Sequence, residues 1–76
     1  MKDEKLRAII QQRIAQCREE MGLSQTELGN LVGKSKTGVA AWEQGDSLPS
    51  ADLLYNLAKI FNKPINYMYG EDGDTN

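Results

Sequence analysis

The residues best suited to chemistry lie together at positions 35–44 of this 76-residue chain. If this stretch is helical, its 3.6-residue period puts Val39 and Trp42, three positions apart, on one side. The opposite side is small, polar and partly basic, and it carries Lys36, Thr37, Ala40, Ala41 and Gln44. Amines, hydroxyls and amides can hydrogen-bond to base edges, and short side chains let a helix lie close to them. This face therefore suits a nucleic-acid groove.

Groups that could serve catalysis or bind a metal are scarce in the sequence. It contains no His, and Cys17 is its single Cys, which excludes an internal disulfide and a Cys/His metal site. A free Cys is most often a small buried packing residue, and we expect this of Cys17. Because there is also no Gly-rich phosphate loop, we predict no enzyme activity, no cofactor and no metal.

The bulk properties of the chain predict one small cytoplasmic domain. No apolar run approaches the roughly 20 residues that a membrane span requires, so no membrane partner is expected. No apolar core of a signal peptide follows the charged residues 1–5. A lone thiol also fits a reducing compartment.

The net charge of −2 argues at first against a nucleic-acid partner. However, Glu71, Asp72 and Asp74 fall in the last six residues, and without these six residues nine basic and eight acidic side chains remain. Local phosphate contacts determine affinity for DNA, so a weakly charged domain can still bind it, although less tightly than a strongly basic one.

Two consecutive helices joined by a tight turn position the polar face. Ser24 followed by Glu27 forms a capping box, which predicts a helix over residues 25–32 whose Leu28, Leu31 and Val32 share a face. Gly33 can adopt a left-handed conformation and end this helix. Ser35 then caps a helix over residues 36–44, whose Val39 and Trp42 point inward to the core.

Three further helices complete an all-α fold of five short helices. Residues 1–5 are expected to be loose, and residues 6–21 to be helical, with Leu6, Ile10, Cys17 and Met21 near one stripe and Ile14 beside it. Ser50 is expected to cap the fourth helix, whose buried stripe is Leu54, Leu57, Ala58 and Phe61, and Asn62 to end it. Pro64 suits the start of a fifth helix over residues 65–69. The domain thus covers residues 6–70, and 71–76 form an acidic tail or the start of a hinge.

The spacing of these residues resembles that of lambdoid phage repressors and Cro-like, XRE-type regulators. The matching positions are Gln25-x-x-Leu28-Gly29-x-x-x-Gly33 and Val39-x-x-Trp42-Glu43-x-Gly45-x-x-x-Pro49, within a resemblance that runs from about Arg13 to Gly70. It implies a lambda-repressor-like helix-turn-helix domain that binds double-stranded DNA and acts as a transcriptional repressor. It also implies a homodimer, weak without DNA, on a pseudo-palindromic operator.

The resemblance implies a division of roles among the DNA-facing residues. The second helix of the motif would contact bases through Ser35, Lys36, Thr37, Ala40 and Ala41. Gln25, Lys34 and Gln44 would contact the DNA backbone, and Arg18 would pair with Glu43 inside the domain. For each DNA contact, a merely solvated side chain is the alternative. Gly38 should weaken its helix by about 1 kcal/mol relative to Ala, and Asp46 stands where relatives often carry a basic residue.

The C-terminal helix carries more apolar surface than a short helix needs. Tyr67, Met68 and Tyr69 are therefore predicted to form a dimer interface, with the alternative that all three belong to the internal core. For the whole chain, the alternatives to a phage-type repressor are a Cro-like regulator, an antitoxin module, or a protein-interaction module that kept the fold without DNA binding. The net charge and Asp46 favour the last of these, whereas Gln25, Lys34 and Lys36 oppose it.

Overall fold

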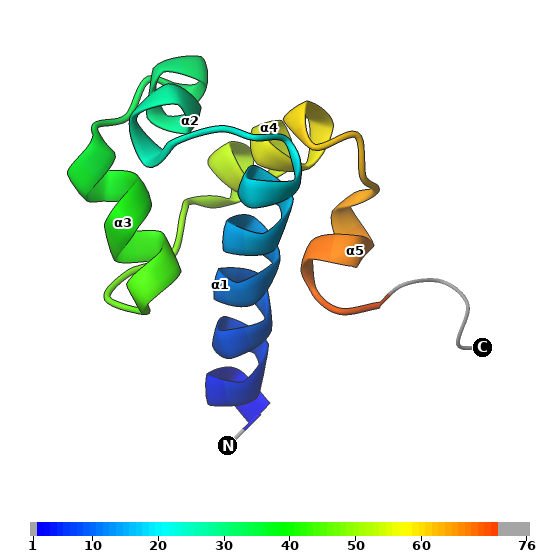
Figure 1. Cartoon of the computed structure of the whole chain (residues 1–76). Coiled ribbons are helices and arrows are strands. Elements are labelled where there is room, and N and C mark those ends of the chain that lie inside the picture. Colours follow the sequence, from blue (N-terminus) through cyan, green and yellow to red (C-terminus); the bar gives the residue numbers. More distant parts are fainter. Residues whose placement is uncertain (1, 72–76) are drawn as a thin grey trace.

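A computed structural model of the chain describes residues 2–71, and within that range it contains five α-helices and no strand. The helices are α1 (Lys2–Glu20), α2 (Gln25–Val32), α3 (Lys36–Gln44), α4 (Ala51–Ile60) and α5 (Ile65–Met68). In Figure 1, α1 stands in the centre, with α2 and α3 on one side of it and α5 on the other. The predicted all-α fold of five helices is confirmed. None of the described helices is long and apolar enough to cross a membrane.

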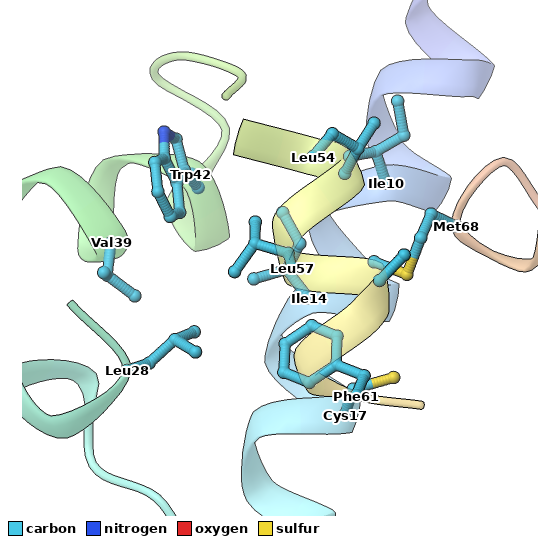
Figure 2. Close-up of a cluster of buried hydrophobic side chains, with 11 residues drawn as sticks. Ile10, Ile14, Cys17, Leu28, Val39, Trp42, Leu54, Leu57, Phe61 and Met68 are labelled. Atoms are coloured by element: carbon cyan, nitrogen blue, oxygen red, sulfur yellow. The ribbon is translucent and has the colours of Figure 1, made fainter. Parts of the chain in front are cut away.

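A single hydrophobic core joins all five helices. Figure 2 shows Ile10, Ile14 and Cys17 of α1 facing Leu28, Val39, Trp42, Leu54, Leu57, Phe61 and Met68, and Ala58 completes the buried set. Trp42 is only 4% exposed, so its indole packs in the core as predicted and does not lie on the polar face of α3. Burial raises the pKa of the Cys17 thiol, which is what a packing residue should show.

Local capping chemistry fixes both ends of α2. The Ser24 hydroxyl accepts a hydrogen bond from the Glu27 backbone at 3.0 Å, and the Glu27 carboxylate accepts one from the Ser24 backbone at 2.7 Å. Gly33 ends the helix with a φ of 73°, a left-handed conformation that glycine adopts without strain. The capping box and the terminating glycine are therefore confirmed.

Gly29 has a role in the turn that the sequence pattern did not reveal. It is buried, and a β-carbon added there would overlap the Lys34 carbonyl oxygen. The Lys34 backbone N–H also donates to the Gly29 carbonyl at 2.8 Å. The absence of a side chain at Gly29 therefore lets the α2–α3 turn fold back onto α2.

Several predicted details of the N-terminal half are wrong. Helix α1 spans Lys2–Glu20, whereas a helix over residues 6–21 was predicted; it starts earlier because no Gly or Pro precedes Leu6. Met1 lies outside the described residues. Leu6 and Met21 are 40% and 47% exposed, because the core covers only the middle of α1 and Met21 follows its last residue. Leu31 is 57% exposed, since it lies beyond the edge of the α2 face that packs on the core.

Two details of the C-terminal half also differ from the prediction. Ser50 has the backbone conformation of an N-cap, but its hydroxyl donates to Asp52 at 2.6 Å and accepts nothing from the helix backbone. Helix α5 ends at Met68, one residue before the predicted end. Leu54, Leu57, Ala58 and Phe61 are buried as predicted, and Asn62 has a φ of 59°, as expected of a left-handed terminator. In the predicted acidic tail, residues 72–76 lie outside the described residues.

Candidate nucleic-acid interface

The polar side of α3 forms a hollow of about 370 Å³. It is lined by Lys36, Thr37, Ala40, Ala41, Gln44 and Asp46. The opposite side of the same helix carries Val39 and Trp42, whose burial fixes which way α3 faces. The structure therefore brings together four of the five residues that were predicted to contact bases, and it adds one predicted backbone contact and an acidic residue.

Ser35, the fifth predicted base contact, is not among the residues that line this hollow. Its hydroxyl accepts a hydrogen bond from the Gly38 backbone at 3.1 Å and thereby caps α3. The cap holds the first turn of α3, where Lys36 and Thr37 begin the exposed face. The observed role of Ser35 is to position this turn.

The three residues predicted to contact the DNA backbone lie on three different parts of the motif. Gln25 is the first residue of α2, where the unpaired N–H groups of a helix N-terminus favour a bound anion. Lys34 lies in the α2–α3 turn and lines a second hollow of about 320 Å³, together with Trp42 and residues of the α3–α4 loop. Gln44, in the last turn of α3, lines the first hollow.

A network of side chains joins helix α1 to the ends of α2 and α3. The Arg18 guanidinium donates from Nε to Oε2 of Glu43 at 2.6 Å and from Nη2 to Oε1 at 3.1 Å. Its third nitrogen, Nη1, donates to the Leu23 carbonyl at 2.7 Å. Gln25 Nε2 adds a donor to Oε1 of Glu43 at 3.0 Å. The predicted partners thus lie in contact, and the network also fixes the Gln25 amide.

This network is more buried than an ordinary surface ion pair. The Arg18 and Glu43 side chains are 13% and 9% exposed, whereas Glu19, 3.6 Å from Arg18, is 70% exposed. The hydrogen bond from Arg18 to Glu43 raises the pKa of the guanidinium above its ordinary value, against the opposing effect of burial. Two parallel N–H···O bonds also hold the two planar groups in one orientation.

The N-terminus of α4 adds an acidic side chain, Asp52, near the turn. The Ser50 hydroxyl bonds the Asp52 carboxylate and lowers the pKa of that group, and backbone N–H groups and the charge of Lys34 act in the same direction. Lys34 therefore lies within electrostatic reach of Asp52 while its own side chain is exposed.

One of the three residues predicted to form a dimer patch at the C-terminal helix is not available at the surface. Met68 is fully buried and packs in the core, so it cannot contribute to a surface. Its neighbours Tyr67 and Tyr69 are half-buried against the core. The ring of Tyr67 also carries two cations, Arg13 at 4.2 Å and Lys63 at 4.7 Å from its centroid.

Asp46 in the hollow is the site residue that sequence reasoning placed least well. From the sequence it was interpreted only as an acidic residue at a position where relatives often carry a basic one. The left-handed Gly45, with a φ of 95°, turns the chain back so that the Asp46 backbone N–H donates to the Ala41 carbonyl at 2.9 Å. The glycine directly after α3 was the signal that could have indicated this turn.

The fold and the site define a helix-turn-helix domain with an exposed polar second helix. A family model described as helix-turn-helix matches residues 14–68, and the chain belongs to this family. The crystal structure of the P22 c2 repressor protein in complex with synthetic operator 9T is similar, with a TM-score of 0.76 and 27% identity over 83% of this chain and 96% of that chain.

Two relatives match over most of the chain. The cryptic phage CTXphi transcriptional repressor RstR of Vibrio cholerae is 33% identical over 64 residues, which are 84% of this chain and 57% of RstR. A protein of Pyrococcus furiosus, whose name describes it as a putative HTH-type transcriptional regulatory protein, is 35% identical over 54 residues, which are 71% of this chain and 17% of that protein. The chain therefore spans only part of the length of both relatives.

Proposed function

We propose that this chain binds double-stranded DNA sequence-specifically and acts as a transcriptional repressor of the phage type. The observation that carries the proposal is the hollow on the polar side of α3, which brings Lys36, Thr37, Ala40, Ala41 and Gln44 onto one surface. An α-helix with its side chains is about 10–12 Å wide, and the major groove of B-DNA is about 12 Å wide. Helix α3 can therefore lie in that groove.

In this arrangement two groups of residues contact different parts of the DNA. Lys36 and Thr37, at the start of α3, meet base edges: the amine reaches guanine acceptors and the Thr methyl packs on a thymine methyl. Gln25, Lys34 and Gln44 meet phosphates on either side of the groove. Occupation of the operator then blocks access of RNA polymerase to the DNA.

The network around Glu43 supports the phosphate contact of Gln25. The amide of Gln25 already gives one N–H to Glu43, so its second N–H remains for a phosphate oxygen. Arg18 holds the carboxylate that orients this amide. The side chain of Gln25 is therefore fixed before DNA binds, which lowers the entropy lost on binding.

We also propose that two copies bind one operator, with Tyr67 and Tyr69 at or near the interface. Their half-buried rings offer little area compared with the roughly 800 Å² per partner of a stable dimer, so the dimer should be weak without DNA. The half-sites should lie about one helical turn, roughly 34 Å, apart. Footprinting at saturation should protect two half-sites; protection of one half-site by one copy would contradict the dimer.

Selection of bound sites from random duplex DNA tests the proposal directly. A sequence-specific protein should enrich one short motif, and the motif should occur twice in inverted orientation. The affinity for the enriched site should fall steeply with salt, because each phosphate contact releases counterions. Recovery of no motif, together with weak binding at low salt, would contradict the proposed function.

A protein-interaction module that kept the fold is the second candidate. The net charge of −2 and the carboxylate of Asp46 in the hollow favour it. Such a module would bind no duplex with a salt slope larger than that of one or two phosphate contacts. Site selection and the salt series together distinguish the two candidates, because a module of this kind should enrich no site and should bind any duplex only weakly, with a shallow dependence on salt.

A further inference from the structure

The hollow on α3 carries opposite charges at its two ends. Lys36 is the first residue of α3, and Asp46 follows the last turn, while Ala40 and Ala41 lie between them in the sequence and line the same hollow. The nine residues of α3 extend roughly 13 Å at 1.5 Å per residue, which corresponds to about four steps of 3.4 Å along DNA. One surface thus presents a donor and an acceptor at positions several base pairs apart.

The carboxylate of Asp46 is available for a ligand. Among the residues that the structure describes, no hydrogen bond or ion pair holds it, and its side chain is exposed. Glu43, three residues earlier, shows the contrast, because Arg18 and Gln25 occupy both of its oxygens. The backbone of Asp46 is nevertheless fixed, since its N–H donates to the Ala41 carbonyl at the end of α3.

The chemistry of a carboxylate restricts what can lie against it on DNA. A phosphate oxygen is excluded, because two anions in contact repel each other. A carboxylate accepts hydrogen bonds and donates none, so the major-groove donors open to it are cytosine N4 and adenine N6. Cytosine N4 is the typical partner of Asp and Glu, because the adjacent N6 donor and N7 acceptor of adenine suit an amide that both donates and accepts. The lysine at the other end of the hollow prefers the opposite partner, the O6 and N7 acceptors of guanine.

We infer that Asp46 is a specificity-determining residue, which accepts a hydrogen bond from the exocyclic amino group of a cytosine at one end of each half-site. This inference rests on the proposed function and names a part of the sequence read by the same surface. Asp46 also disfavours non-specific DNA, where no amino group meets the carboxylate and its repulsion of phosphates remains uncompensated. The half-site should therefore have a guanine read by Lys36 and, about four base pairs away, a cytosine read by Asp46.

Two substitutions separate the acceptor from the charge. Asp46→Ala removes both, whereas Asp46→Asn removes the charge and keeps a carbonyl acceptor. Neither should disturb the fold, since the carboxylate has no partner among the described residues. Glu20→Gln is the matched control, because Glu20 is an exposed acid at the end of α1, outside the hollow, and its substitution changes the net charge as Asp46→Asn does.

The experiment is selection of sites from random duplexes with the full chain and each variant, followed by affinities on the enriched site with each base at the position in question. The wild type should prefer cytosine there, and Asp46→Ala should lose roughly 10- to 100-fold of that preference. Asp46→Asn should retain part of it, and both variants should bind scrambled DNA more tightly than the wild type. Glu20→Gln should keep the preference of the wild type.

Other outcomes would overturn the inference. If Asp46→Ala raised operator and scrambled binding by the same factor, Asp46 would only repel phosphates. If the wild type preferred another base at every position that Asp46→Ala affects, the cytosine assignment would be wrong. In both cases the wild type still enriches a site, so the proposed function stands. Failure of the wild type to enrich any site would instead contradict the proposed function itself.

Discussion

Substitution of Glu43 by Gln should destabilise the domain, because Glu43 is the acceptor at the centre of the network. The carboxylate receives two N–H groups from Arg18 and one from Gln25, and it is 9% exposed. Glutamine has the same shape but offers one acceptor oxygen and one NH₂ group. That NH₂ group must face an N–H of Arg18 or Gln25, so at least one hydrogen bond is replaced by two opposed donors.

The expected loss is about 2 kcal/mol in the free energy of unfolding. Breaking a fully buried ion pair costs about 3–5 kcal/mol, and a hydrogen bond to a charged group contributes about 1.5–3 kcal/mol. Here the Arg18 side chain is 13% exposed and keeps its hydrogen bond to the Leu23 carbonyl. The expected loss therefore lies in the range for a hydrogen bond to a charged group, and below the range for breaking a fully buried ion pair. A domain of this size has a total stability of roughly 4–11 kcal/mol, so the loss should be easily measured.

Urea unfolding followed by Trp42 fluorescence is the assay. With a slope of about 1 kcal/mol per molar urea, Glu43→Gln should lower the midpoint by about 2 M and leave the slope unchanged. Glu19→Gln is the matched control: Glu19 lies 3.6 Å from the same Arg18 but is 70% exposed, so its loss should cost less than about 0.5 kcal/mol. Equal midpoints for the two variants would refute the account of the network.

Two further substitutions test local features of α3 and α4. Gly38→Ala should raise the free energy of unfolding by about 1 kcal/mol in the same assay, because alanine favours the helix more than glycine does. The added carbon would have only ordinary contacts, the nearest being the Ser35 hydroxyl at 3.7 Å. A lowered urea midpoint would show that the fold itself requires this glycine. Ser50→Ala should raise the pKa of Asp52, followed by NMR titration of its carboxyl carbon, because the Ser50 hydroxyl is the main cause of the lowered value. Since that pKa is lowered in the folded state, Asp52 contributes stability above its unfolded pKa of about 3.9, and the contribution is lost as the pH falls through the folded value. An Asp52 pKa unchanged by Ser50→Ala would assign the shift to the backbone N–H groups of α4.

The features that the sequence predicted well depend on neighbours within one helical turn. Ser24, Glu27 and Gly33 satisfy the ends of α2 by contacts a few residues away, so their types and spacing determine their roles. The inward position of Trp42 follows in the same way from its spacing to Val39. Such rules fixed the direction in which α3 faces, and hence most of the hollow.

The features that the sequence did not predict depend on how helices meet. Leu31 and Met68 are both apolar residues on short helices, yet the first is 57% exposed and the second fully buried, because only packing decides which face is covered. The Gln25 bond to Glu43 joins residues 18 positions apart, and the placement of Asp46 depends on the turn at Gly45. No local periodicity carries this information.

The central claim is that α3 reads bases while the turn before it holds the backbone, and two lysines two residues apart test it. Affinities of Lys36→Ala and Lys34→Ala should be measured on the enriched site and on a scrambled duplex at two salt concentrations. Lys36→Ala should lose about 1–3 kcal/mol on the enriched site and much less on the scrambled duplex, whereas Lys34→Ala should weaken both similarly and reduce the salt slope by about one. If Lys36→Ala weakened both duplexes by the same factor, Lys36 would be a phosphate contact and the assignment of base reading to α3 would be contradicted.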